Sequence, residues 1–106
     1  PPLKHVTLTS IDAPRPGSSI YLKGTNLDGA SGYRTEGTAA YFDASAEIGG
    51  ERKTVSFANE VDADPDIPWM GTWPGDLPTS GKLTVTVTPD PDKPEFDQTP
   101  VSISET

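Results

Sequence analysis

Hydrophobic and polar residues alternate along several short segments of the chain. Within "HVTLTSI" (5–11), "SSIYLKG" (18–24) and "KLTVTVT" (82–88), apolar residues recur at a spacing of two, and the residues beside them are mostly Thr, Ser, Lys or Tyr. A period of two is typical of a strand with one buried face. The positions that this pattern places in the core are Val6, Leu8, Ile20, Leu22, Val55, Phe57, Leu83, Val85 and Val87, followed by Val101 and Ile103 near the end of the chain.

Turn signals separate these segments at short intervals. Further strands are expected in "TAAYFDA" (38–44), "KTVSFANEV" (53–61), "WMGTW" (69–73) and "VSISE" (101–105), and Gly49-Gly50 is expected at the tip of a hairpin. No segment has a helical period. Seven or eight short strands with frequent turns predict an all-β fold, an Ig-like sandwich of two antiparallel sheets.

Composition agrees with this fold class. The chain has 106 residues, which is one domain (1–106), and its 12 prolines and 10 glycines suit short strands joined by many turns. The segment 89–100, "PDPDKPEFDQTP", is an acidic, proline-rich loop that we expect to be extended and mobile in places. There is no cysteine, which excludes a disulfide framework and a thiolate metal site.

Two stretches resemble a known group of domains. "SIDAPRPGSSIYLKGTNL" (10–27) is similar to the start of IPT/TIG-type immunoglobulin-like domains, and "LPTSGKLTVTVT" (77–88) resembles their last turn and strand. The middle of the chain does not match, and the strand at 101–105 is additional. The resemblance implies an Ig-like sandwich and a connector, binding module or accessory domain. The residues that carry the first match are Ile11, Pro16, Gly17, Ile20, Leu22, Gly24, Asn26 and Leu27.

Charge narrows the range of partners. Sixteen acidic and eight basic residues give a net charge of −8. Such a field repels nucleic-acid backbones and anionic membrane surfaces, and no apolar run approaches the ~20 residues of a membrane span. We expect a monomer in isolation that binds another protein or larger assembly, steered by lysines and arginines on the partner. One or both of the terminal strands are expected at a sheet edge, where backbone groups can recruit that partner.

Alternating aspartates suggest only a weak metal site. Asp62, Asp64 and Asp66 could offer oxygen ligands to calcium, but Ile67 and Trp73 stand where an EF-hand loop requires glycine and glutamate. The second acidic group is in the proline-rich loop and consists of Asp90, Asp92, Glu95 and Asp97. A solvated, charged loop accounts for both groups, so we expect no essential metal and no cofactor.

The two tryptophans allow three interpretations. Trp69 and Trp73 are four residues apart, which places both on one face of a strand. They could fill the core of the sandwich, anchor a protein interface, or form a platform for stacking a sugar, with Asp66 and Asp76 binding its hydroxyls. The core interpretation is favoured for at least one of them.

The sequence offers little for catalysis. His5 is the only histidine and lies near the chain terminus, and no strained Gly-x-Ser-x-Gly turn is present. We therefore expect no enzymatic activity. The leading hypothesis is a structural or adhesive module on a larger assembly, such as a virion decoration protein or a bacterial surface or secreted protein. That places it outside the cell, at the cell surface or on a virion, and the alternative is a carbohydrate-binding module using Trp69 and Trp73.

Overall fold

The computed structural model describes residues 1–60 and 65–105 and is built from β-strands. These residues contain no α-helix, and so no helix that could span a membrane. A single 3₁₀ turn, η1, covers Leu27–Gly29. The eight strands are β1 (Thr7–Asp12), β2 (Ser19–Thr25), β3 (Arg34–Glu36), β4 (Ala39–Ile48), β5 (Glu51–Asn59), β6 (Trp69–Thr72), β7 (Leu83–Val87) and β8 (Val101–Glu105).

The alternating segments of the sequence form the strands, as predicted. Burial alternates at every residue of β4 and β7, because successive side chains in a strand point to opposite faces. β4 and β5 form a hairpin, and Gly49 and Gly50 make its tip with φ of 59° and 86°. Both central residues of a type I′ turn need positive φ, which glycine adopts without steric cost. The strand predicted at 38–44 runs on to Ile48, and the short strand β3 was not predicted.

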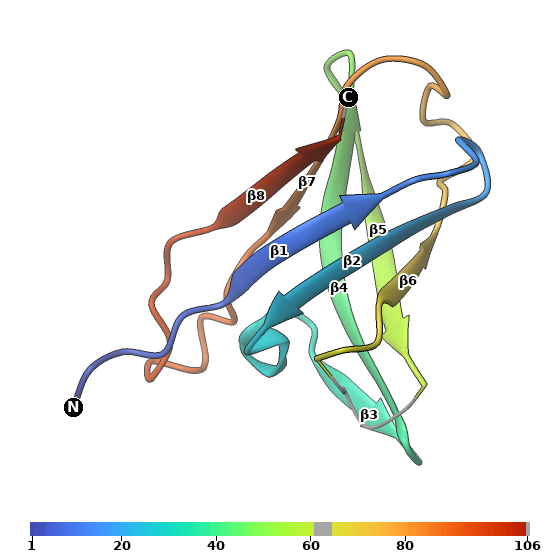
Figure 1. Ribbon diagram of the computed structural model, residues 1–106. Coiled ribbons are helices and arrows are strands. Elements are labelled where there is room, and N and C mark those ends of the chain that lie inside the picture. The colour runs from blue at the N-terminus through green and yellow to red at the C-terminus, as the bar shows by residue number, and fades with distance from the viewer. Residues whose placement is uncertain (61–64, 106) are drawn as a thin grey trace.

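The strands form one antiparallel sheet in the order β1-β2-β6-β5-β4-β7-β8, with β3 paired to β4 away from this path. The sheet curls until β1 and β8 at its two ends lie against each other, which gives a nearly barrel-shaped fold (Figure 1). A parallel bridge between Lys4 and Phe96 joins the segments that precede these two strands. The all-β prediction is thus confirmed, whereas the hydrogen-bonded path is continuous and does not by itself divide into two sheets.

Both terminal strands lie at the ends of the sheet, as predicted, but each faces the other. Near-closure of this kind shields unpaired edge groups, in the way that barrels remove edges altogether. β1 also contains an irregularity between Leu8 and Ser10, so that Leu8 pairs with Gly24 and Ile11 pairs with Leu22. This bulge lets Leu8 and Ile11 both face the interior despite their odd spacing.

The buried residues form one cluster inside the curled sheet. Every predicted core position is buried except Leu8, Val101 and Ile103, which are half-buried because they lie on the two terminal strands. The ring of Phe42 packs between Phe57, at a centroid distance of 5.5 Å, and Trp69, at 4.9 Å. The largest side chains that are fully buried are Trp69, Phe42, Phe57, Ile20, Leu22, Val85 and Val87.

The proline-rich loop differs from the extended segment that we expected. Backbone N–H groups of Lys93 and Phe96 donate to the carbonyls of Asp90 and Lys93, so the loop is folded into consecutive turns. Phe96 is buried, and its ring lies so close to Gly29 that a Cβ atom there would come within 2.4 Å of it. Sequence analysis did not identify Phe96 as a core residue, because a single aromatic residue among prolines and acidic residues shows no periodic pattern.

Candidate functional site

The two tryptophans are core residues. Trp69 is 2% exposed and Trp73 is 7% exposed, and the Nε1–H of Trp73 donates to the carbonyl of Leu77 at 3.2 Å. The prediction that at least one of them fills the core is confirmed for both. The sugar-stacking interpretation requires exposed ring faces, and this arrangement presents none.

The aspartates assigned to that sugar site are not gathered around the rings. Asp66 is exposed in the turn before β6, whereas Asp76 lies in the loop after it, at the opposite end of that strand. The carboxylate of Asp76 is 4.0 Å from Lys53 Nζ and is largely solvent-exposed. The predicted set of Trp69, Trp73, Asp66 and Asp76 is therefore not one surface.

Only one of the three aspartates proposed as calcium ligands lies among the residues that the structure describes. Asp62 and Asp64 lie outside the described residues, and Asp66 is the one member of that group inside them. In residues 1–60 and 65–105 no three metal-binding side chains come together. The carboxylates of Asp90 and Asp97 instead accept hydrogen bonds from the backbone N–H groups two residues later, as turn-forming aspartates do.

A small hollow lies where β1 and β8 approach each other. It has a volume of about 300 Å³ and is lined by His5, Val6, Asp97, Thr99 and Val101. The backbone N–H of Thr99 donates to Asp97 at 2.9 Å, and this bond and the Thr99 hydroxyl lower the pKa of the Asp97 carboxyl. The proximity of His5 acts in the same direction.

A row of outward-facing residues crosses the outer surface of the curled sheet. Strand register pairs Tyr21 with Met70, Met70 with Ala58, and Ala58 with Tyr41. Met70, at 44% exposure, is one of two large exposed hydrophobic residues in the described chain, and Leu3 is the other. At the two ends Tyr21 pairs with Asp12 and Tyr41 pairs with Arg34. We call this set the outer row: Asp12, Tyr21, Met70, Ala58, Tyr41 and Arg34.

The orientation of the outer row follows from the buried residues beside it. Ile20 and Leu22 flank Tyr21 and are fully buried, so Tyr21 points away from the core. Trp69 and Gly71 have the same relation to Met70. Sequence analysis missed the row because its members come from six strands. One signal was available: in "WMGTW" Met70 is apolar although it alternates with the two tryptophans and so points away from their side of the strand.

Arg34 is held in place at one end of the outer row. Its guanidinium carbon lies 5.3 Å from the centre of the Tyr41 ring. Its nitrogens donate to the Gly32 carbonyl at 2.8 Å, to the Ser56 hydroxyl at 3.0 Å and to Asp43 at 3.4 Å. These contacts fix the position of the cation, and almost half of its side chain stays exposed.

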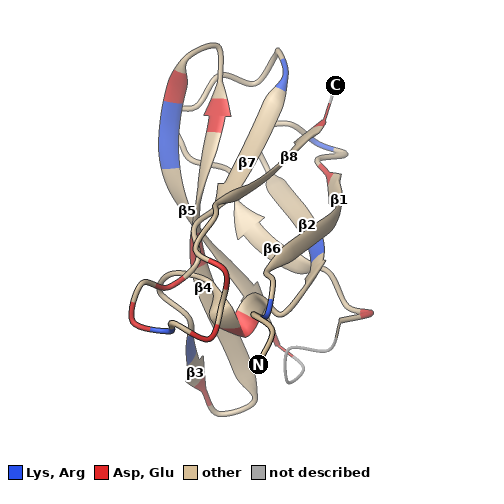
Figure 2. Cartoon of the chain, turned by 90° about the vertical axis from the view of Figure 1, so that its left-hand side faces the viewer, with Lys and Arg blue, Asp and Glu red and all other residues tan. Residues whose placement is uncertain are grey.

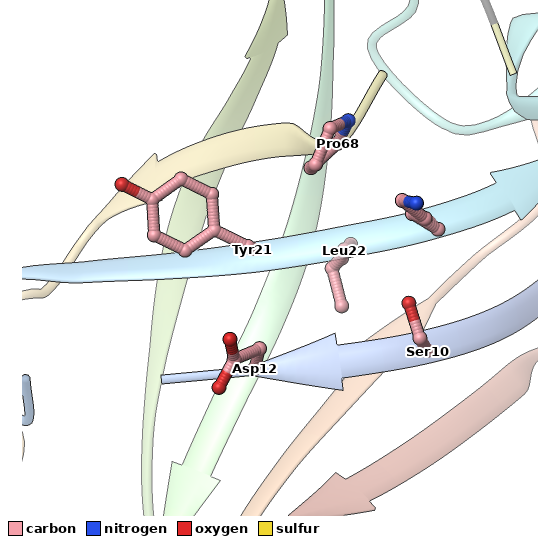
Figure 3. Close-up of a pocket in the computed structure, with 6 residues that line it drawn as sticks. Ser10, Asp12, Tyr21, Leu22 and Pro68 are labelled. Carbon is pink, nitrogen blue, oxygen red and sulfur yellow. The ribbon is translucent and has the colours of Figure 1, made fainter. Parts of the chain in front are cut away.

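The other end of the outer row is hollowed. A depression of about 360 Å³ is lined by Ser10, Asp12, Tyr21, Leu22, Lys23 and Pro68. Figure 3 shows Tyr21 and Asp12 on neighbouring strands at this depression, with Pro68 beyond them. It combines an apolar floor with a carboxylate and an ammonium group.

Charge is distributed unevenly around the molecule. Acidic residues gather along the loop before β8, where Asp90, Asp92 and Glu95 stand within a few residues of one another (Figure 2). The outer row contains one acid, one base and four uncharged residues. It is thus locally balanced in a chain of net charge −8.

No family model, no curated protein and no solved structure matches the chain. The resemblance to IPT/TIG-type domains stays a prediction from residues 10–27 and 77–88.

Proposed function

We propose that the chain is a non-catalytic, Ig-like structural or adhesive module that acts through protein contacts on a larger assembly. A virion decoration protein and a bacterial surface or secreted protein are the settings that suit it, outside the cell, at the cell surface or on a virion. Strand order supports the Ig-like assignment. If the path is divided at the β4–β5 hairpin, one part reads β1-β2-β6-β5 and the other β4-β7-β8. These are the A-B-E-D and C-F-G orders of immunoglobulin constant-type domains, when β3 is treated as an addition.

The observation that carries the function is the outer row. Tyrosine, methionine and arginine are enriched in protein interfaces, and the row pairs Tyr21 with the exposed Met70 on the outer side of β2 and β6, with Tyr41 and Arg34 farther round the curled sheet. Its central residues are uncharged, so contact there requires no desolvation of an ion at the centre of the interface. A single exposed hydrophobic residue is ordinary on a protein surface, and it is the pairing of Met70 with Tyr21 that favours a contact here.

The carbohydrate alternative has lost its principal support. It depended on stacking by Trp69 and Trp73, whose rings are buried. The one feature that still favours it is the depression beside Tyr21 and Asp12, which offers one half-buried aromatic side chain and a carboxylate.

The test compares partner capture by three forms of the module from an extract of its source. Wild type should retain a defined protein partner, and Met70→Asp should lose it because a carboxylate is placed at the centre of the row. Leu3→Asp is the matched control, because it makes the same change at the other exposed hydrophobic residue. Retention of the same partner by Met70→Asp would refute the assignment of this surface, and oligosaccharide binding on a glycan array without a protein partner would favour the alternative.

A further inference from the structure

We propose that the depression on β1 and β2 binds an extended segment of a partner protein in which an arginine and an acidic residue are two positions apart. The arginine lies on Tyr21 with its guanidinium group at Asp12, and the acidic side chain reaches Lys23. This inference rests on the proposed function, since it takes the end of the outer row around Tyr21 as part of the contact and names the chemistry of the partner.

The depression is built by side chains of two paired strands. Register pairs Asp12 with Tyr21 and Ser10 with Lys23, and the buried Leu22 lies between these two pairs (Figure 3). The bulge of β1 comes immediately before Ser10, and an extra residue of this kind bends a strand and re-aims the side chains beside it. All of these residues are neighbours in the sheet, so the site does not depend on how the sheet curls farther round.

The two charged side chains of the depression are available to a ligand. Asp12 is exposed and Lys23 is half-buried, and neither has an ion-pair partner among residues 1–60 and 65–105. They are diagonal neighbours, on adjacent strands and offset by two residues in register. Diagonal positions of this kind are ~7–8 Å apart. The site thus presents a carboxylate and an ammonium group at a defined spacing.

An extended peptide matches this spacing. A strand rises about 3.3 Å per residue, so side chains two positions apart point the same way and lie ~6.6 Å from each other. One of them can meet Asp12 while the other meets Lys23. A basic and an acidic residue at these positions satisfy both charges of the site, whereas two residues of like charge satisfy one and repel the other.

Tyr21 favours arginine over lysine at the basic position. Its half-buried ring stands beside the Asp12 carboxylate in the register of the two strands. A guanidinium group is planar, so it can stack on an aromatic ring and donate two hydrogen bonds to one carboxylate, whereas an ammonium group is a compact point charge. The methylene groups of an arginine can also pack on the apolar wall that Tyr21 and Pro68 provide. The net charge of −8 favours the approach of such a cation.

The experiment is an NMR titration of the isotope-labelled chain with acetyl-Arg-Ala-Glu-amide at low salt. We expect shifts centred on the amides of Asp12, Tyr21 and Lys23 and a dissociation constant in the millimolar range, because exposed ion pairs are individually weak. The isomer acetyl-Arg-Glu-Ala-amide has the same charges on neighbouring residues, which point to opposite sides of an extended chain. It should therefore bind at least ~3-fold more weakly. Equal affinity of the two peptides would contradict the spacing of the site.

Variants locate the bound peptide. Asp12→Asn and Lys23→Gln should each weaken the binding of acetyl-Arg-Ala-Glu-amide at least ~3-fold. Asp76→Asn and Lys82→Gln are the matched controls, because they make the same changes of charge at exposed positions that do not line the depression, and they should leave the affinity unchanged. Wild-type affinity in Asp12→Asn, or shifts confined to other residues, overturns the inference.

The outcomes separate this inference from the proposed function. The three-residue peptide is held by Asp12, Tyr21 and Lys23, so its binding and the capture of a partner through Met70 are separate measurements. If the peptide does not bind and Met70→Asp still abolishes capture, only the assignment of an arginine and an acid fails; if Met70→Asp also leaves capture intact, the proposed surface fails as well. Shifts at these residues with an oligosaccharide, but not with the peptide, would assign the depression to a sugar and overturn the inference.

Discussion

The indole of Trp69 meets the ring of Phe42 edge-on, with a centroid distance of 4.9 Å and 60° between the ring planes. Phe42 lies on β4 and pairs across the hairpin with Phe57 on β5, whose ring stacks on it. β6 thereby packs on the β4–β5 hairpin through one aromatic group, although only two residue pairs link β5 to β6 by register. Aromatic packing therefore supports a junction at which the sheet has few pairs.

Phe42→Ala should strongly destabilise the fold. The side chain is fully buried, and its removal leaves a cavity between Phe57 and Trp69. Loss of a core phenylalanine costs about 3–5 kcal/mol. Urea unfolding followed by tryptophan fluorescence measures the change, with the exposed Thr72→Ala as control, expected within about 0.5 kcal/mol of wild type. A Phe42→Ala protein with an unchanged midpoint would contradict the packing described for this junction.

Both tryptophans should resist collisional quenching. Trp69 and Trp73 are at most 7% exposed, so acrylamide should quench the native protein much less than the urea-unfolded chain. Their emission should also lie at shorter wavelength in the native state, because the indoles are shielded from water. Equal quenching of the native and unfolded chain would reopen the sugar-stacking hypothesis for these residues.

Gly71→Ala should destabilise the chain by about 1–3 kcal/mol, the usual cost of overpacking a core. A Cβ atom at residue 71 would lie 2.5 Å from Val55 Cγ1 and 2.8 Å from Phe57 Cε1. Gly75→Ala is the matched control, because a Cβ there meets no atom within 4 Å. Thermal unfolding of the two variants checks the difference, and equal melting temperatures would show that β6 can move away from β5 at little cost.

Local pattern was enough to predict most of the strands. Alternation identified β2 and β7, and paired glycines identified the hairpin tip at residues 49 and 50, because both signals reside in neighbouring residues. β3 was missed, since its three residues, Arg34–Glu36, are all exposed and show no alternation.

The closure of the sheet and the outer row depend on contacts distant in sequence. Tyr21 and Met70 become neighbours only through the register of β2 with β6, and no local pattern specifies that register. The burial of Phe96 likewise depends on the space beside Gly29, far away in the chain. For the same reason, the sequence alone did not decide whether the tryptophans lie in the core or on the surface, because that depends on which side of β6 faces the interior of the curled sheet.

Phe96→Ala should destabilise the loop before β8 and the seam, by which we mean the contact between the segments that precede β1 and β8. The Phe96 ring is buried on Gly29 and lies 5.6 Å from Lys4 Nζ, and the N–H of Lys4 donates to the carbonyl of Glu95. We expect a cost of about 3 kcal/mol, at the low end for a core phenylalanine because the site lies near the surface. Glu95→Ala, at an exposed neighbouring position, is the control. Amide exchange at Lys4 and Asp97 should accelerate in Phe96→Ala alone, and unchanged exchange there would show that the ring does not hold the seam.

Asp97 should titrate below an ordinary aspartate, whose pKa is about 3.9. The backbone N–H and the hydroxyl of Thr99 donate to the carboxylate and favour its charged form, with a smaller contribution from His5. Because the pKa is lowered in the folded state, the resulting stability is fully present above the unfolded value and is lost as pH falls through the folded pKa.

Asp97→Asn tests this linkage without removing an acceptor for the Thr99 N–H. The melting temperature of wild type should exceed that of Asp97→Asn at pH ~6, and the gap should close as pH falls below ~3.9 and through the lowered pKa. NMR titration of the Asp97 carboxyl carbon gives the pKa directly. In Thr99→Ala the carboxyl should titrate closer to its ordinary value without reaching it, since the backbone N–H remains. A midpoint at or above about 3.9 in wild type would mean that the turn from Asp97 to Thr99 is not formed in solution.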